Sequence, residues 1–373
     1  MKAPKILPRC GRCVSTGNIH GCMVHGYMVH GRMVHTKLTE DFSIMRAIRR
    51  ILVGIKDPHV RLRPAVTKAA QLARAFGAEL VLFQAIPVPV YLDADVFSMG
   101  IGLADAERAI RDGFLERLEL IARRLRAKHI KVRFSAEYDY PIYEAIIREA
   151  RRVKADLIVA GEHGERHIAP GLLHLTDREL LRLSPVPVLL VKRGGTYRRP
   201  LVLAAVDPDR SCDKPARLDE AILSAGSAVT RALRGTLHAI HAYVGVPLTA
   251  FSAGALSDRD IQKIRMCSAR RANEKLRRLA RRVVPESRCH AVDRHAADAI
   301  EEIATQTRSA LVVMGTMSRS GLRRLVIGNT AERVLNHLSC DVLVIKPAGL
   351  IKHVPRARRR VPYMRFQPAA AIL

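Results

Sequence analysis

The residues best suited to chemistry lie in one glycine-rich segment near the C-terminus. The segment combines glycines with short polar side chains, which are Gly315, Ser318, Gly328, Asn329 and Thr330. A glycine at the end of a strand lets backbone N–H groups approach a phosphate closely, because it has no Cβ. A helix predicted from residue 331 would present free N–H groups and the positive end of its dipole to the same place. The segment is therefore predicted to bind a phosphate-like anion.

Charged residues elsewhere support this prediction in the second half of the chain and oppose it in the first. Arginines at positions 319, 323 and 324 add positive charge to the segment, and Asp207 follows an apolar run upstream. The first half carries a weaker copy with Asp57, Gly161 and Gly164. There Glu162 places negative charge where phosphates would lie, and His174 replaces the third glycine. We expect the first copy to be a degenerate site.

These candidate residues belong to two copies of one unit. Residues 138–192 align with 292–346 at a constant offset of 154 without a gap, and 12 of the 55 positions are identical. Short apolar runs alternate with amphipathic helical patterns in both halves. This regular similarity indicates an internal duplication.

Each copy reads as about five strands alternating with helices in some 150 residues. Right-handed crossovers then predict an α/β fold, with an open five-stranded parallel sheet in each copy and helices on both faces. Ligands of such sheets bind at the carboxyl ends of the strands, at the switch point of the strand order. Asp57 and Asp207 follow the first strand of their copies, and Gly161 and Gly315 end the fourth.

Three motifs resemble one known family. They are Met314-Gly-Thr, Gly328-Asn-Thr-Ala-Glu and the closing Cys340-Asp-Val-Leu-Val-Ile-Lys-Pro. Over about residues 46–348 the sequence resembles the universal stress proteins of the UspA superfamily, most of all the tandem E-type members. The resemblance implies two tandem UspA-like (adenine nucleotide alpha hydrolase-like) domains. ATP-binding members carry Gly-x2-Gly-x9-Gly-Ser/Thr, from which this chain departs at Ser318 and Asn329.

The resemblance implies a non-catalytic stress-response protein that binds ATP, with Mg²⁺, in its second domain. Asp207 would hydrogen-bond the adenosine, and the glycine-rich segment would hold the phosphates. The fifth strands of the family pair across a dimer, which here would place Val188–Val191 beside Val342–Ile345 within one chain. A further homodimer is also compatible with the family. The alternative is an interaction protein of the same fold, whose degenerate sites bind a protein partner, another anionic metabolite or RNA.

Composition limits which partners and cellular locations fit the chain. The 373 residues carry a formal net charge of +28, which raises the question of a nucleic-acid partner. Most of this charge lies on the polar faces of predicted helices, where we interpret it as a solvated surface. Nucleic-acid binding is therefore expected only through the tail 351–373, which carries six basic and no acidic residues. No apolar run is long enough to span a membrane. Seven irregularly spaced cysteines favour a reducing compartment, so we expect a cytoplasmic protein.

The chain is therefore divided into a disordered extension 1–44, a first domain 45–196, a second domain 197–350 and a basic tail 351–373.

We predict no enzymatic activity, because no P-loop, nucleophile elbow or zinc-protease motif is present. Cysteines and histidines cluster in the extension and in two loops, and the largest loop groups are His163, His167 and His174, and Cys289, His290 and His295. Their spacing matches no known ligand set, so no metal site is predicted.

Overall fold

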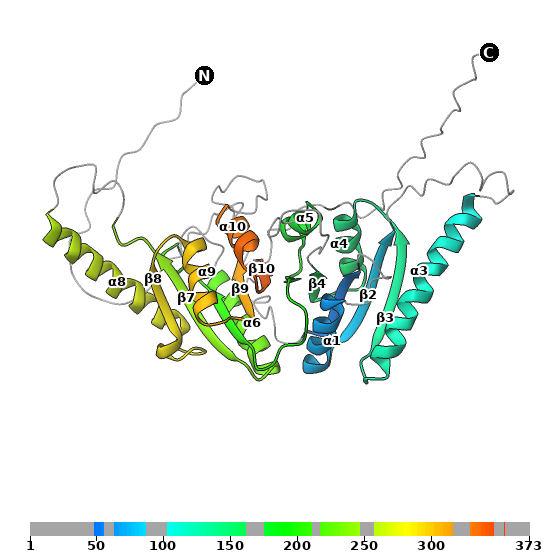
Figure 1. Cartoon of the computed structure of the whole chain (residues 1–373), viewed down its shortest axis with the longest axis horizontal. Coiled ribbons are helices and arrows are strands. Elements are labelled where there is room, and N and C mark those ends of the chain that lie inside the picture. Colours follow the sequence, from blue (N-terminus) through cyan, green and yellow to red (C-terminus); the bar gives the residue numbers. More distant parts are fainter. Residues whose placement is uncertain are drawn as a thin grey trace, which may run out of the picture. The chain divides into compact units, whose positions relative to one another are not determined.

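The computed structural model describes residues 48–55, 63–86, 103–161, 175–210, 217–246, 257–315, 329–346 and 354 (Figure 1). These residues all belong to one compact unit of the chain, 41–373. The predicted extension 1–44 and, apart from Val354, the basic tail lie outside the described residues.

The first half of the chain alternates strands and helices. Its elements are β1 (Arg50–Ile55), α1 (Pro64–Phe76), β2 (Glu79–Ile86), α3 (Leu103–Arg126), β3 (Val132–Tyr138), α4 (Ile142–Arg152), β4 (Leu157–Gly161), α5 (Leu175–Leu183) and β5 (Val188–Val191). Local sequence explains the boundaries of α1. Proline stands in its first turn, where its missing N–H costs nothing, and Gly77 ends it with a left-handed φ of 66°.

The second half repeats the order. Its elements are β6 (Leu201–Ala205), the 3₁₀ turn η1 (Pro208–Arg210), α6 (Leu218–Ala232), β7 (Thr236–Tyr243), α8 (Asp258–Ala280), η2 (Glu286–Arg288), β8 (Cys289–Asp293), α9 (Ala296–Gln306), β9 (Leu311–Gly315), α10 (Asn329–His337) and β10 (Asp341–Ile345). Helix α10 begins two residues earlier than the sequence pattern predicts, so Asn329 and Thr330 form its first turn.

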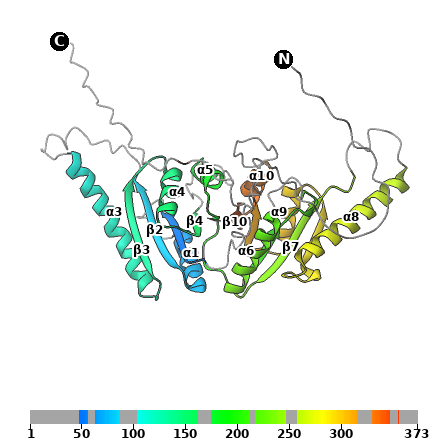
Figure 2. The ribbon, with the colours of Figure 1, turned by 180° about the vertical axis from the view of Figure 1, so that it is seen from behind.

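Ten strands form one continuous sheet in the order β3-β2-β1-β4-β5-β10-β9-β6-β7-β8 (Figures 1 and 2). Strands within each half are parallel, as expected from the alternation of strands and helices. The halves join where β5 and β10 pair antiparallel, with Leu189 opposite Leu343. The expected pairing of the two fifth strands is present, and it merges the two five-stranded sheets into one.

Helices cover both faces of the sheet. One apolar cluster includes buried side chains of α1, α3, α6 and α8, and the other includes those of α4, α5, α9 and α10. The first, fourth and fifth strands of both halves contribute to both clusters, which explains why their sequences are apolar without alternation. In the described part of the chain, no helix has the length and hydropathy needed to cross a bilayer.

The junction between the halves contains a buried ionic network. The Asp341 carboxylate is fully buried on β10, where it pairs with the Lys68 ammonium of α1 and accepts a 2.5 Å hydrogen bond from the Tyr197 hydroxyl. Backbone N–H groups of Lys192 and Arg193 donate to its other oxygen at 2.9 and 3.1 Å. Burial and the Asp341 charge raise the pKa of Tyr197 well above its ordinary value, so its hydroxyl stays a donor. The network ties the segment between the halves to both of them.

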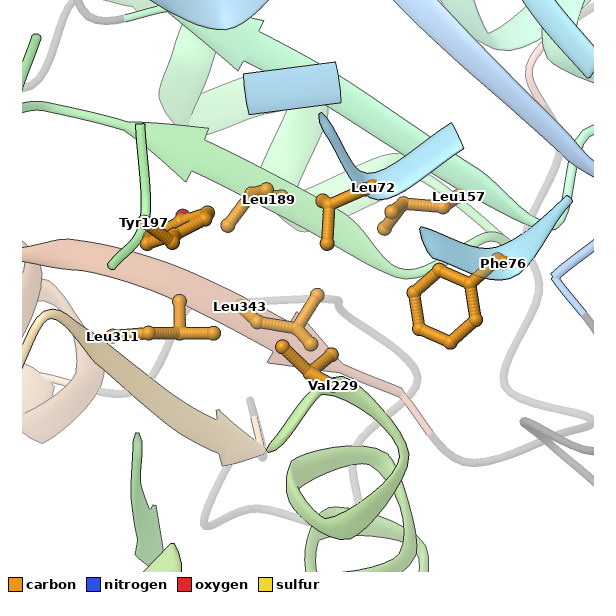
Figure 3. Close-up of a pocket in the computed structure, with 8 residues that line it drawn as sticks. All are labelled: Leu72, Phe76, Leu157, Leu189, Tyr197, Val229, Leu311 and Leu343. Atoms are coloured by element: carbon orange, nitrogen blue, oxygen red, sulfur yellow. The ribbon is translucent and has the colours of Figure 1, made fainter. Parts of the chain in front are cut away.

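Apolar side chains meet beside this network. Figure 3 shows a pocket lined by Leu72, Phe76, Leu157, Leu189, Tyr197, Val229, Leu311 and Leu343, which come from both halves. Leu189 and Leu343 are also the central residues of the β5–β10 pair. The junction is therefore an apolar core with one buried ion pair, and both halves contribute to it.

Candidate functional site

The second half places two predicted site residues at one edge of the sheet. Strands β6 and β9 are parallel neighbours, with Ala204 opposite Val313. Gly315 is the last residue of β9 and Asp207 follows the end of β6, so both lie at the carboxyl ends of adjacent strands. Strand β7 lies beside β6, and β10 lies beside β9, so the strand order runs in opposite directions from this pair. The space between β6 and β9 is therefore the switch point of the strand order in this half.

Gly315 allows helix α6 to pack closely on the end of β9. A Cβ at this position would lie 2.9 Å from Leu218 Cδ2 and 3.3 Å from Ile222 Cδ1. The 2.9 Å contact is closer than real Cβ atoms come, so another residue would force the ends of these two side chains to shift. This contact gives the glycine a packing role in addition to the predicted phosphate role.

Asp207 is held at the rim of the sheet. Its backbone N–H donates to Asp219 Oδ1 of α6 at 3.1 Å, which fixes the turn after β6. Its side chain is 37% exposed and its Oδ1 lies 3.9 Å from His241 Nδ1. The carboxylate is therefore accessible and faces a histidine.

His241 is part of a polar group that sequence reasoning missed. The ring is buried beneath α8 and η1, its Nε2 lies 3.0 Å from Asp209 Oδ2, and Lys275 Nζ lies 2.5 Å from Asp209 Oδ1. Burial alone would raise the pKa of Asp209, but Lys275 and His241 lower it below its ordinary value. The His241 Nδ1 atom is buried without a hydrogen-bond partner among the described residues. The available signal was the presence of two histidines, His238 and His241, in the otherwise apolar segment 237–242.

The remaining predicted phosphate contacts are only partly visible. Ser318 and Gly328 lie outside the described residues. Asn329 and Thr330 form the first turn of α10, where helices leave their N–H groups without internal partners. The start of α10 therefore offers free backbone N–H groups of the kind that attract an anion.

The corresponding edge of the first half differs. Gly161 ends β4, and a Cβ there would lie 3.4 Å from Ala65 of α1, a tolerable contact. Gln84 occupies the sixth position of β2, as His241 does in β7, and its Nε2 donates to the Ala85 carbonyl. Asp57 and Gly164 lie outside the described residues. The aspartate–histidine–lysine arrangement of the second half has no equivalent in the described part of the first.

A buried ion cluster fills the end of β3 in the first half. Arg148 binds both carboxylate oxygens of Asp139, at 2.6 and 2.8 Å, and also Glu144 at 2.9 Å. In the second half the equivalents of Glu144 and Arg148 are Asp298 and Glu302, which pair instead with surface arginines of α10 and the β8–α9 turn. The charged residues at these equivalent positions therefore form a buried cluster in the first half and surface ion pairs in the second.

Histidines form a pair but not a metal site. His238 Nδ1 and His290 Nε2 lie 2.9 Å apart on neighbouring strands, and burial lowers the pKa of both rings, with the His290 charge contributing for His238. No group of three or more metal-ligating side chains occurs within the described ranges. His163, His167 and His174 lie outside those ranges.

Comparisons with known proteins agree with the duplicated architecture. The model of the Universal stress protein family matches residues 47–192 and again 201–346. Universal stress protein E of Escherichia coli K12 is 26% identical over 325 residues, covering 81% of this chain and 95% of that protein. The Haemophilus influenzae homologue is 27% identical over 212 residues, or 55% of this chain and 66% of that protein.

Solved structures give the same result. A functionally unknown protein from Pseudomonas aeruginosa PAO1 matches with a TM-score of 0.61 and 25% identity, covering 82% of this chain and 94% of that one. A putative universal stress protein from Pseudomonas aeruginosa UCBPP-PA14 matches with a TM-score of 0.60, 25% identity and 95% coverage of its chain. The similarity therefore spans both halves together.

Proposed function

Because the chain belongs to the universal stress protein family, we propose that it is a cytoplasmic stress-response protein whose second half binds ATP or a related nucleotide without turning it over. The observation that carries this proposal is the set of polar groups around Asp207. An accessible carboxylate, a buried histidine and a lysine-bound aspartate lie at the ends of β6 and β7, beside the strand that ends in Gly315. The first half lacks this set in its described part.

The fit to a nucleotide rests on complementary chemistry. Asp207 would accept hydrogen bonds from the nucleoside, and the segment from Gly315 through Ser318 and Gly328 to Asn329 and Thr330 would hold the phosphates. Bound Mg²⁺ would offset part of the phosphate charge. The three described cysteines, Cys267, Cys289 and Cys340, are free thiols, which supports a reducing compartment.

Calorimetry and thermal unfolding with Mg-ATP test the proposal on the full chain. At 100 times its dissociation constant, ATP is expected to stabilise the protein by about 2.7 kcal/mol. The D207A variant should lose this stabilisation, whereas the matched D57A variant should keep it. Recovered ATP should be intact. No heat and no stabilisation at millimolar Mg-ATP would refute nucleotide binding. Loss of the stabilisation in D57A but not in D207A would assign nucleotide binding to the first half.

A purely structural role is the second candidate, and one observation favours it. Gly315 makes room for the side chains of Leu218 and Ile222, so this packing gives the glycine a role without any ligand. In that case the chain acts through a protein partner or another anion. The same experiment separates the two, because a structural protein would give no ATP-dependent change in wild type or either variant.

A further inference from the structure

Two helices at equivalent places in the two halves carry very different charge. Each follows the second strand of its half and packs on the edge strand, α3 on β3 and α8 on β8. Helix α3 contains six arginines and five acidic residues, a net charge of +1. Helix α8 contains eight basic and three acidic residues, a net charge of +5. Helix α3 occupies the equivalent position with a net charge of only +1. A helix at this position can therefore be solvated without the larger positive charge that α8 carries.

The charge of α8 is concentrated on one face. Ala272, Leu276 and Ala280 are buried against the sheet. At 100° per residue, the opposite side carries a group of exposed basic residues that continues just past the helix, which we call the basic face. Its members are Lys263, Arg270, Arg271, Arg277, Arg278, Arg281 and Arg282. From Lys263 to Arg278 the helix rises about 22 Å.

Few carboxylates neutralise the basic face. Arg270 lies 3.9 Å from Glu274 and Arg277 lies 3.4 Å from Glu286. The other five members have no acidic partner within the described part of the chain. Helix α3 likewise has two arginines, Arg108 and Arg123, in 3.0 Å ion pairs, but it carries five acidic residues for its six arginines. The basic face is therefore a cationic strip that carboxylates neutralise only in part.

We propose that the basic face binds the phosphodiester backbone of nucleic acid without reading its sequence. Six of its seven members are arginines, whose planar guanidinium groups donate two parallel hydrogen bonds to a phosphate. A rise of about 22 Å matches about six phosphates along one strand of a duplex. The helix contains no aromatic residue, so it offers no ring on which a base could stack.

An anionic membrane fits the same face less well. Helices that lie in a bilayer interface need a wide apolar face beside their basic residues. On the part of α8 that the structure describes, Met266 is the one large apolar side chain exposed to solvent, at 68%. This surface is also separate from the proposed nucleotide site, because Lys275, which binds Asp209, lies outside the basic face.

Fluorescence anisotropy on the full chain tests the proposal. The probes are a DNA duplex of about 20 base pairs and a single-stranded RNA of mixed sequence, each titrated between about 50 and 200 mM salt. Removing one phosphate contact lowers the slope of log K against log salt by about one, so R271Q/R278Q/R282Q should lower it by about three. The control R111Q/R117Q/R124Q removes the same charge from exposed positions of α3 and should leave the slope unchanged.

The outcomes are separable. Binding of both probes supports backbone recognition, and a preference for one identifies DNA or RNA as the source of the phosphates. Equal losses in the two triple variants would overturn the proposal, since they would indicate diffuse attraction to net charge. So would an absence of binding at low salt, or binding to anionic vesicles without binding to either nucleic acid. Thermal melts of both variants check that they remain folded.

Discussion

The two halves differ where equivalent positions meet. At the centre of the antiparallel β5–β10 pair Leu189 faces Leu343, its equivalent at the offset of 154, and the same offset separates Arg178 from Glu332. Around this centre, Arg178 pairs with Glu332 at 2.7 Å. Two identical halves would bring two arginines or two glutamates together at this place. The duplicated chain brings one of each, so its halves have become complementary rather than remaining equal.

A second difference concerns the start of the fifth strand. The first half has Pro187 just before β5, and at the same offset of 154 the second half has Asp341 as the first residue of β10. Asp341 pairs with the charged Lys68 of the first half and accepts hydrogen bonds from the Lys192 N–H and the Tyr197 hydroxyl in the segment after it. The comparison teaches that the junction depends on contacts that one half alone cannot make.

The largest effect is expected when the buried ion pair is broken. D341N leaves the Lys68 ammonium, 4% exposed, without its carboxylate, and such losses cost about 3–5 kcal/mol. Denaturant unfolding at neutral pH measures the change. The double variant K68M/D341L removes both charges and should recover part of the loss. A change below about 1 kcal/mol in D341N, the value of an exposed pair, would contradict the description of a buried network.

An intermediate effect is expected at Lys346, whose Nζ donates to the Arg182 carbonyl at 2.5 Å. Burial, with the Arg182 charge, lowers the pKa of Lys346 to about 7. The unfolded chain therefore holds a proton that the folded chain has lost between pH 7 and about 10. Stability must rise with pH in this window, by at most about 1.4 kcal/mol per unit.

The variant K346M isolates this contribution. Unfolding free energies at pH 7, 8 and 9 should increase for wild type relative to K346M, since methionine has no proton to lose. Parallel curves for the two proteins would show that Lys346 does not titrate in this window, and the assignment would have to be abandoned.

The smallest effect is expected at the surface pair. Arg178 and Glu332 are 47% and 27% exposed, and exposed ion pairs contribute about 0.2–1 kcal/mol. R178E places two carboxylates together and should destabilise by that order, whereas R178E/E332R restores opposite charges and should return to the wild-type value. Thermal unfolding of wild type, R178E, E332R and R178E/E332R forms a double-mutant cycle. Additive effects would mean that the pair makes no contribution.

Much of the fold followed from local patterns. Apolar runs, helical periodicity and the offset of 154 predicted the order of elements and the parallel pairing within each half. The contact between the fifth strands was expected only from the resemblance to the family. The network of Lys68 and Asp341 was not predicted, because these residues are 273 positions apart and no local pattern links them. A lysine within the apolar stripe of α1 and an aspartate at the start of an apolar strand were the signals present.

Only part of the candidate site was predicted, because some of its residues come together through contacts that are distant in the sequence. Asp207 and Gly315 follow strand ends, and the topology of a parallel sheet brings such ends together. His241 and Lys275 join the site through the packing of α8 against η1 and β7, which depends on tertiary contacts. The packing role of Gly315 likewise required knowing that α6 crosses that strand end.

The antiparallel β5–β10 pair determines how the stability of the sheet depends on protein concentration. Two separate subunits joined by such a pair would come apart as their concentration fell, and their stability would depend on how much protein was present. Here the partner strand is part of the same polypeptide, so its effective concentration is fixed by the connecting chain. The ten-stranded sheet should therefore be as complete in a cell that contains few copies of the protein as in one that contains many.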